Sequence, residues 1–210
     1  MSLQALLAEV DHDWHAAPGG EATCDAALLA QARESALGRR LLARELAAGP
    51  GAALLAPAPG RDAGAVARRW PRASLSALSR DLGVLAFAPA IRAEIRREPV
   101  RRMKAALGSS YLLALDQGVW NGRATAEVQL ALQAHLARAL LSETAPAEAL
   151  FAMFEGQGRA ELAAWARQRD PALADWVALL HPRHAQAPAH LPEKPVLRVV
   201  THHESRVAGA

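Results

Sequence analysis

The stretch of sequence that decides the fold is SLSALSRDLGVLAFAPAIRAEIRREPVRRMKAALGSSYLLALDQGVWNG, residues Ser74–Gly122. Four of its leucines recur at the three- and four-residue spacing that places side chains on one face of an α-helix. They are Leu75, Leu78, Leu82 and Leu85. This stripe predicts a helix with one buried face.

Proline and glycine divide the rest of this stretch. Pro89 can open a second helix, because proline at the first helical position gives up only an amide that has no partner there. Pro99 disfavours helical geometry in Glu98, so the second helix is expected to break at that pair. Gly108 suits a left-handed cap, and Ser109 or Ser110 can begin a further helix. The pattern predicts a series of short amphipathic helices.

Positive charge is concentrated across the second and third of these helices. Six basic residues stand against the two acids Glu94 and Glu98, which leaves a local net charge of +4. We interpret the basic residues as a docking surface for an acidic partner, although charged helix faces are also commonly just solvated. They are Arg92, Arg96, Arg97, Arg101, Arg102 and Lys104.

The composition of the whole chain predicts an all-α protein. Apolar residues make up 51% of the 210 residues, but Phe, Trp and Tyr together reach only 4%, and alanine, leucine, arginine and glutamate dominate. We expect one multi-helix domain over residues 1–181, with an irregular connection at about 48–60. The proline-rich segment 182–210 shows no obvious helical periodicity, and we predict an extended or flexible tail there.

Glycine, proline and capping residues predict helix boundaries outside the central stretch. One helix is expected over residues 25–47 and another over 124–142, with His135 on the apolar stripe of the second. Gly156 and Gly158 are expected to end a helix that begins near Pro146. Asp170 is expected to cap the helix that follows it.

Charge and cysteine content favour a cytoplasmic protein. The formal net charge is +3, and the single cysteine, Cys24, cannot form an internal disulfide. No apolar run approaches the roughly 20 residues that cross a bilayer, and residues 1–14 lack the basic start of a signal peptide.

Sequence motifs for enzymes, cofactors and metals are absent. The chain has no GxxxxGK[ST], GxGxxG, HExxH, GxSxG or CxxC pattern, so we expect a protein that is not an enzyme and holds no cofactor. His12 and His15 lie beside two aspartates, and five further histidines lie between His181 and His203. His12 and His15 could share a helical face with a carboxylate, but no third partner is identifiable nearby. The spacing of the five later histidines matches no compact site, and no metal is expected.

Trp70 offers an alternative function. It lies among Arg68, Arg69 and Arg72, and an aromatic ring between arginines can stack on a base while the arginines contact phosphates. A helical nucleic-acid-binding or regulatory protein is therefore the second hypothesis. Packing of the indole in the core, covered by arginine side chains, is the simpler interpretation.

The central stretch also resembles the SctK/YscK family, the cytosolic sorting-platform proteins of bacterial type III secretion systems. The similarity covers about a quarter of the chain. It rests on residues 79–85, 90–92, 99–100, 107–108, 111–115 and 118–120.

This resemblance implies a non-enzymatic adaptor at the cytosolic face of the inner membrane. Its partners would be the cytosolic domain of the SctD-type ring protein and the SctQ-type protein of the cytosolic pod. The resemblance supplies no contact residues. The basic residues from Arg92 to Lys104 are docking candidates by location and charge alone.

Overall fold

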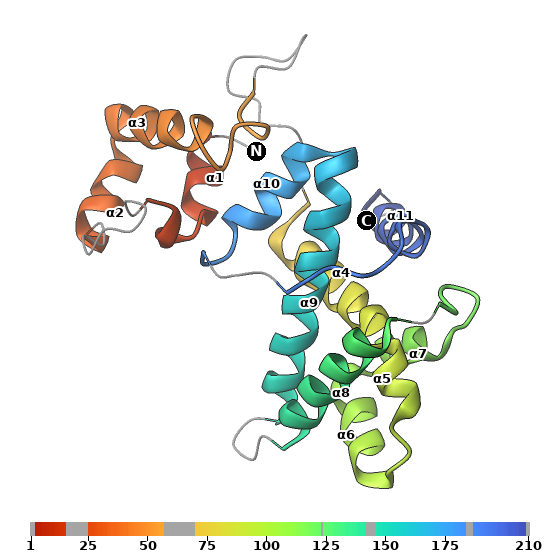
Figure 1. Ribbon diagram of the computed structural model, residues 1–210. Helices are drawn as coiled ribbons and strands as arrows, with labels where there is room; N and C mark the ends of the chain where they lie inside the picture. Colours follow the sequence, from red (N-terminus) through yellow and green to blue (C-terminus); the bar gives the residue numbers. More distant parts are fainter. Residues whose placement is uncertain are drawn as a thin grey trace. The chain divides into compact units, whose positions relative to one another are not determined.

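A computed structural model describes residues 3–15, 25–56, 70–122, 124–141, 146–183 and 187–208 of the chain. In these ranges every regular element is a helix (Figure 1), which confirms the predicted all-α class. Contacts within the chain group it into two compact units. Residues 1–72 and 166–185 form the first unit, and residues 73–165 and 186–210 form the second.

The first unit is built from short helices that come from two separate segments of the chain. They are α1 (Leu3–Glu9), the 3-10 helix η1 (His12–His15), α2 (Ala26–Glu34), α3 (Ala36–Ala47) and α10 (Pro171–Leu179). The side chain of Trp176 is fully buried in this unit. The indole nitrogen of Trp14 donates to the carbonyl of His181 at 2.8 Å, and Asp175 accepts from the amides of Ala53 and Leu54 at 2.8 and 3.1 Å. These bonds join its early and late segments.

The helix predicted over residues 25–47 is interrupted at Ser35. The backbone of Ser35 is extended, and its hydroxyl accepts from the amide of Gly38 at 2.9 Å, so that it caps α3. Serine competes for backbone hydrogen bonds in this way, which explains why one long apolar pattern becomes two helices. The sequence also predicts a short helix over residues 61–70, ended by Pro71, and residues 61–69 lie outside the described residues.

The second unit contains the stretch Ser74–Gly122. Its helices are α4 (Arg72–Ala86), α5 (Ala88–Ala93), α6 (Arg97–Leu107), α7 (Ser110–Leu115), α8 (Ala126–Leu140), α9 (Pro146–Arg169) and α11 (Glu193–Ala208), with Arg72 and residues 166–169 belonging to the first unit. The four leucines of the predicted stripe on α4 are at most 3% exposed, so that prediction is confirmed. Phe87 and Phe154 meet edge to face in this core, with ring centroids 5.4 Å apart.

The break between α5 and α6 lies before the predicted position. The backbone is extended at Glu94 and Arg96, and α6 begins at Arg97, so Pro99 lies inside the first turn of α6. Proline is tolerated there because amides in the first turn have no intrahelical acceptor. As predicted, α6 ends at Gly108, which has a positive φ of 53°, but its ψ of −126° is not that of a left-handed αL cap.

The predicted end of a helix at Gly156 and Gly158 is wrong, because α9 continues through both glycines to Arg169. At Gly158 the helix lies against the backbone of α4 at Ser79 and Gly83. Gly83 in turn lies against the backbone of α9 at Phe154. Gly83 and Gly158 therefore allow α4 and α9 to pack closely, and Gly158 does not end its helix.

The tail predicted for residues 182–210 is extended only in part. Residues 187–192 have no regular secondary structure, but α11 forms over Glu193–Ala208. Val196, Val199, Val200 and His203 are all buried. Their spacing is that of a helix face, although β-branched residues such as valine have low intrinsic helix propensity. Burial against the second unit outweighs that preference.

Candidate functional site

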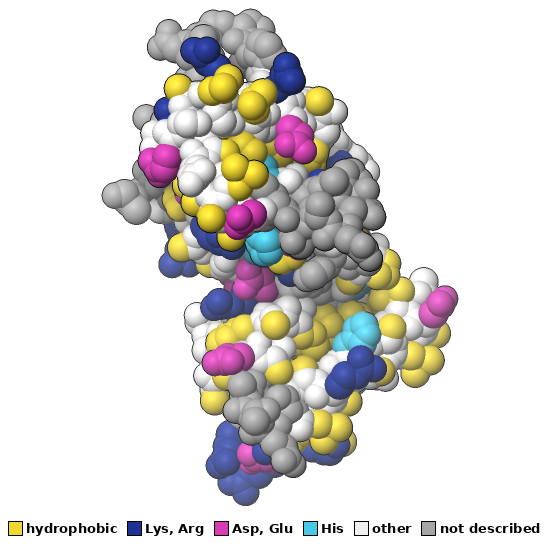
Figure 2. Space-filling model, turned by 90° about the vertical axis from the view of Figure 1, so that its left-hand side faces the viewer, with side chains coloured by type: hydrophobic (Ala, Val, Ile, Leu, Met, Phe, Trp, Pro, Cys, Tyr) yellow, Lys and Arg dark blue, Asp and Glu magenta, His cyan; other side chains and the backbone are white. Residues whose placement is uncertain are grey.

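Apart from Arg92 on α5, the basic residues predicted as a docking surface lie on α6 and on the turn before it. Figure 2 shows Lys and Arg side chains gathered around an acidic side chain at the lower end of the view, the end at which Figure 1 places α6. Five of the six predicted site residues are exposed there, and we call these five the basic surface. They are Arg96, Arg97, Arg101, Arg102 and Lys104.

Arg92, the sixth predicted site residue, has a different role. It is half-buried, and its guanidinium donates to the carbonyl oxygens of Ala114 at 2.7 Å and Trp120 at 2.9 Å. Ala114 lies in the last turn of α7, where carbonyl groups have no donor within the helix, and a buried carbonyl without a donor is costly. Arg92 therefore holds the segment 114–120 in place, and because its guanidinium is used within the fold we do not include it in the docking surface.

Two acids, Glu94 and Glu98, partly neutralise the basic surface. Arg96 binds Glu94 at 2.6 Å, and the Arg96 hydrogen bonds hold the pKa of Glu94 down at about 2. Glu98 is shared by Arg101 at 3.2 Å and Arg102 at 3.3 Å. Five cations against two acids still leave a net charge of +3 on this surface.

Arg97 and Arg101 are the residues of the basic surface that are most available to a partner. Arg97 makes no hydrogen bond or ion pair within the described parts of the chain, and the Arg101 side chain is 75% exposed. By contrast, Arg102 donates to the carbonyl of Leu140 at 3.0 Å, and the Lys104 ammonium lies 5.5 Å from the ring centroid of Tyr111. These two side chains also contact their own fold.

Two hollows lie beside the basic surface, where α5 and α6 meet α8. Their volumes are about 220 and 240 Å³, and both are lined by Arg96 and Ala137. Leu136 lines the first hollow, and Leu140 with Leu141 lines the second. Ile95 and Leu141 are 89% and 78% exposed. Apolar side chains bordered by cations match an acidic segment that also carries apolar residues.

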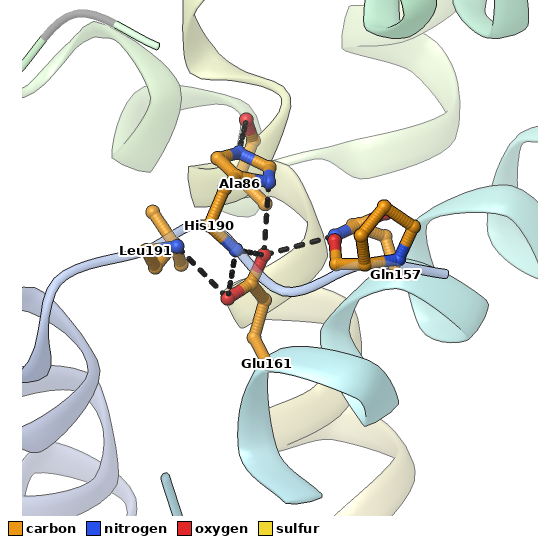
Figure 3. Close-up of polar contacts among 6 residues, drawn as sticks. Ala86, Gln157, Glu161, His190 and Leu191 are labelled. Carbon is orange, nitrogen blue, oxygen red and sulfur yellow. Dashed lines mark hydrogen bonds and ion pairs between the residues drawn. The ribbon is translucent and has the colours of Figure 1, made fainter. Parts of the chain in front are cut away.

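A second polar cluster, around Glu161 on α9, anchors the segment before α11 (Figure 3). The Glu161 carboxylate is 2% exposed and accepts from the amides of His190 and Leu191 at 3.0 Å each and from the Gln157 side chain at 2.9 Å. It also pairs with Nδ1 of His190 at 3.1 Å, while Nε2 of that ring faces the carbonyl of Ala86 at 3.1 Å. A buried carboxylate needs such partners, and the cluster fixes residues 188–191 to α9 and α4.

This cluster is not predicted from the sequence, because His190 falls in the segment 182–210 that is expected to be an extended or flexible tail. Glu161 is separated from His190 by 29 residues, and only the tertiary structure brings them together. The sequence does contain a signal for a buried carboxylate, because Glu161 stands between the apolar residues Ala160 and Leu162. Both neighbours are buried in the structure. A carboxylate at a core position requires a partner.

The histidines near the N-terminus do not act together. Asp11, His12 and Asp13 lie close enough for their ligand atoms to be within 4.8 Å of one another, but they are partly exposed and such groups commonly occur without an ion. His15 is buried, and its two ring nitrogens have no hydrogen-bond partner among the residues that can be described. Burial and the nearby cations Arg33 and Arg183 lower the pKa of His15 to about 4.

His135 is exposed on α8, so its predicted place on the apolar stripe of that helix is wrong. Trp70 is half-buried, and its carbonyl accepts from the indole nitrogen of Trp176 at 3.3 Å. Arg68 and Arg69, its predicted partners for nucleic acid, lie outside the described residues.

Comparisons of the chain with protein-family models, with curated proteins and with solved structures found no match. Among the described residues, no helix is both long and apolar enough to cross a membrane.

Proposed function

We propose that this protein is a non-enzymatic adaptor that binds an acidic segment of a partner protein on the basic surface of α6. The proposal rests on the combination of exposed Arg97 and Arg101, two adjoining hollows and the exposed side chains Ile95 and Leu141. The cations would steer and orient an acidic segment, and the apolar side chains would supply contact area.

The resemblance of residues 79–120 to the SctK/YscK family names the partners to test first. In that setting the protein would link the SctD-type ring protein to the SctQ-type pod protein in a type III secretion sorting platform. It would then be held at the cytosolic face of the inner membrane through a protein partner. Two partners require two surfaces, and the basic surface would serve one of them.

Titration calorimetry with the purified partners tests the proposal. The full chain is titrated separately with the SctQ-type protein and with the cytosolic domain of the SctD-type protein. We expect the double variant Arg97→Glu and Arg101→Glu to bind one of the two at least about tenfold more weakly, because like charges would then face an acidic segment.

The matched control is Arg40→Glu with Arg44→Glu, which changes the net charge equally at exposed residues of α3. It should bind as the unmodified chain does. Absence of binding to both proteins, or equal binding by both double variants, contradicts the proposal. Binding to a short DNA duplex that weakens steeply with salt and is lost in the Arg97 and Arg101 variant would favour the nucleic-acid hypothesis instead.

A further inference from the structure

A cavity of about 430 Å³ lies in the second unit beside α11, away from the hollows of the basic surface. Its polar lining includes Arg198, His202 and Arg206 from α11 and Ser109 from the turn before α7. Leu113 and Val119 supply apolar lining. This volume falls in the range of sites that hold small organic molecules.

The charge inside this cavity is positive. Asp81 is the acid in its lining, and both of its oxygens are already engaged. One accepts from the hydroxyl of Ser110 at 2.6 Å, and the other lies 2.9 Å from Nε2 of the buried His203. The cavity is therefore lined by two arginines and by one carboxylate whose oxygens are already bound by Ser110 and His203.

The two arginines retain donors for a ligand. Arg198 donates one guanidinium nitrogen to the carbonyl of Gly118, which fixes the side chain over the segment 116–119. Arg206 makes no hydrogen bond or ion pair within the described ranges and is exposed. A guanidinium presents five N–H donors in a planar fork, which suits a carboxylate or a phosphate.

We infer that this cavity binds a small organic oxyanion, a carboxylate or phosphate monoester attached to an apolar body. Arg198 and Arg206 bind the oxyanion, and the hydroxyl of Ser109 provides a further donor. The apolar body packs against Leu113 and Val119. The inference shares no residue with the basic surface and does not depend on the adaptor proposal.

The probes are phenyl phosphate, benzoate, inorganic phosphate and the neutral benzyl alcohol, each titrated into the isotopically labelled full chain and followed by amide chemical shifts. We expect phenyl phosphate or benzoate to saturate a site whose shifts include residues 109–119 and 198–206. Inorganic phosphate should bind at least about tenfold more weakly, and benzyl alcohol should not saturate. Preference between the two organic anions identifies the oxyanion.

Arg198→Gln with Arg206→Gln should weaken the binding at least about tenfold, because it removes the charged donors from exposed side chains and leaves the core intact. Arg97→Gln with Arg101→Gln is the matched control and should bind normally. Amide spectra outside the site verify that both variants are folded. Failure of every anion to saturate, equal binding by benzyl alcohol or inorganic phosphate, or undiminished binding by the Arg198 and Arg206 variant overturns the inference.

Discussion

Gly158 on α9 lies so close to Gly83 on α4 that a β-carbon at Gly158 would be 2.7 Å from the backbone nitrogen of Gly83. The same β-carbon would meet the carbonyl of Ser79. Any side chain at Gly158 therefore forces the backbones of α4 and α9 apart. Glu161 and Gln157 lie on α9 and Ala86 lies on α4, so the separation of these two helices affects the geometry of the Glu161 cluster.

Gly158→Ala should lower the free energy of unfolding by about 2 kcal/mol or more, because the added methyl meets backbone atoms that cannot rotate away. Gly156→Ala is the control on the same helix. Its β-carbon would find only the guanidinium of Arg159 at 3.9 Å. Alanine there should stabilise the helix by up to about 1 kcal/mol. Urea unfolding of both variants gives the comparison, and similar effects would contradict the close crossing.

His15 should make stability fall with acid. Its folded pKa of about 4 lies below its usual value of 6.5, so the unfolded chain binds more protons between these two pH values. Stability is therefore retained above pH 6.5 and is lost as the pH falls towards 4, by about 1–2 kcal/mol after allowance for solvent screening.

His15→Leu should flatten this part of the pH dependence and should not lower stability at pH 7, because it removes two buried nitrogens that have no partner among the described residues. Thermal or urea unfolding at a series of pH values between 4 and 7 measures the effect. The exposed His12 provides the control, since His12→Leu should leave the pH dependence almost unchanged. An unaltered slope in His15→Leu would show that another group is responsible.

Glu161→Gln should release the segment before α11. Glutamine keeps one acceptor oxygen in place of two, so its NH2 group must face either the amides of His190 and Leu191 or the side-chain donor of Gln157. Buried donors without acceptors cost about 1–3 kcal/mol each. Hydrogen exchange should accelerate over residues 188–208, more than elsewhere in the second unit. Glu148→Gln, an exposed change on the same helix, is the control. Uniform loss of protection across the unit would argue against a local anchor.

Asp81→Asn should destabilise the second unit at neutral pH. Burial raises the pKa of Asp81, but hydrogen bonds from His203 and Ser110 and nearby positive charge outweigh burial and leave that pKa below its usual value. The carboxylate thus contributes stability above about pH 4 that is lost in stronger acid. The variant should be less stable at pH 7 and less sensitive to acid below pH 4. Unfolding curves at pH 3 and pH 7 test both expectations, and equal losses at the two pH values would refute them.

Local patterns predicted much of the helix content because they report properties that a helix shows by itself. The leucine stripe of α4, the cap at Asp170 and the positive φ of Gly108 all follow from spacing and backbone geometry within a few residues. The exposure of Arg97 and Arg101 agrees with the same periodicity, since the apolar positions Met103 and Leu107 of α6 are buried.

Only the tertiary structure decided which local signals prevail. Gly158 lies inside a helix because the backbone of α4 packs where a side chain at this position would be. The valines of α11 are helical because the face of the helix that carries them is buried. Arg92 leaves the predicted docking surface because the carbonyls of Ala114 and Trp120 need donors. Each outcome depends on a contact between residues distant in sequence. Spacing along the chain predicts which faces are apolar, but the partner that covers a face and the atoms that satisfy a buried polar group are set by packing in three dimensions.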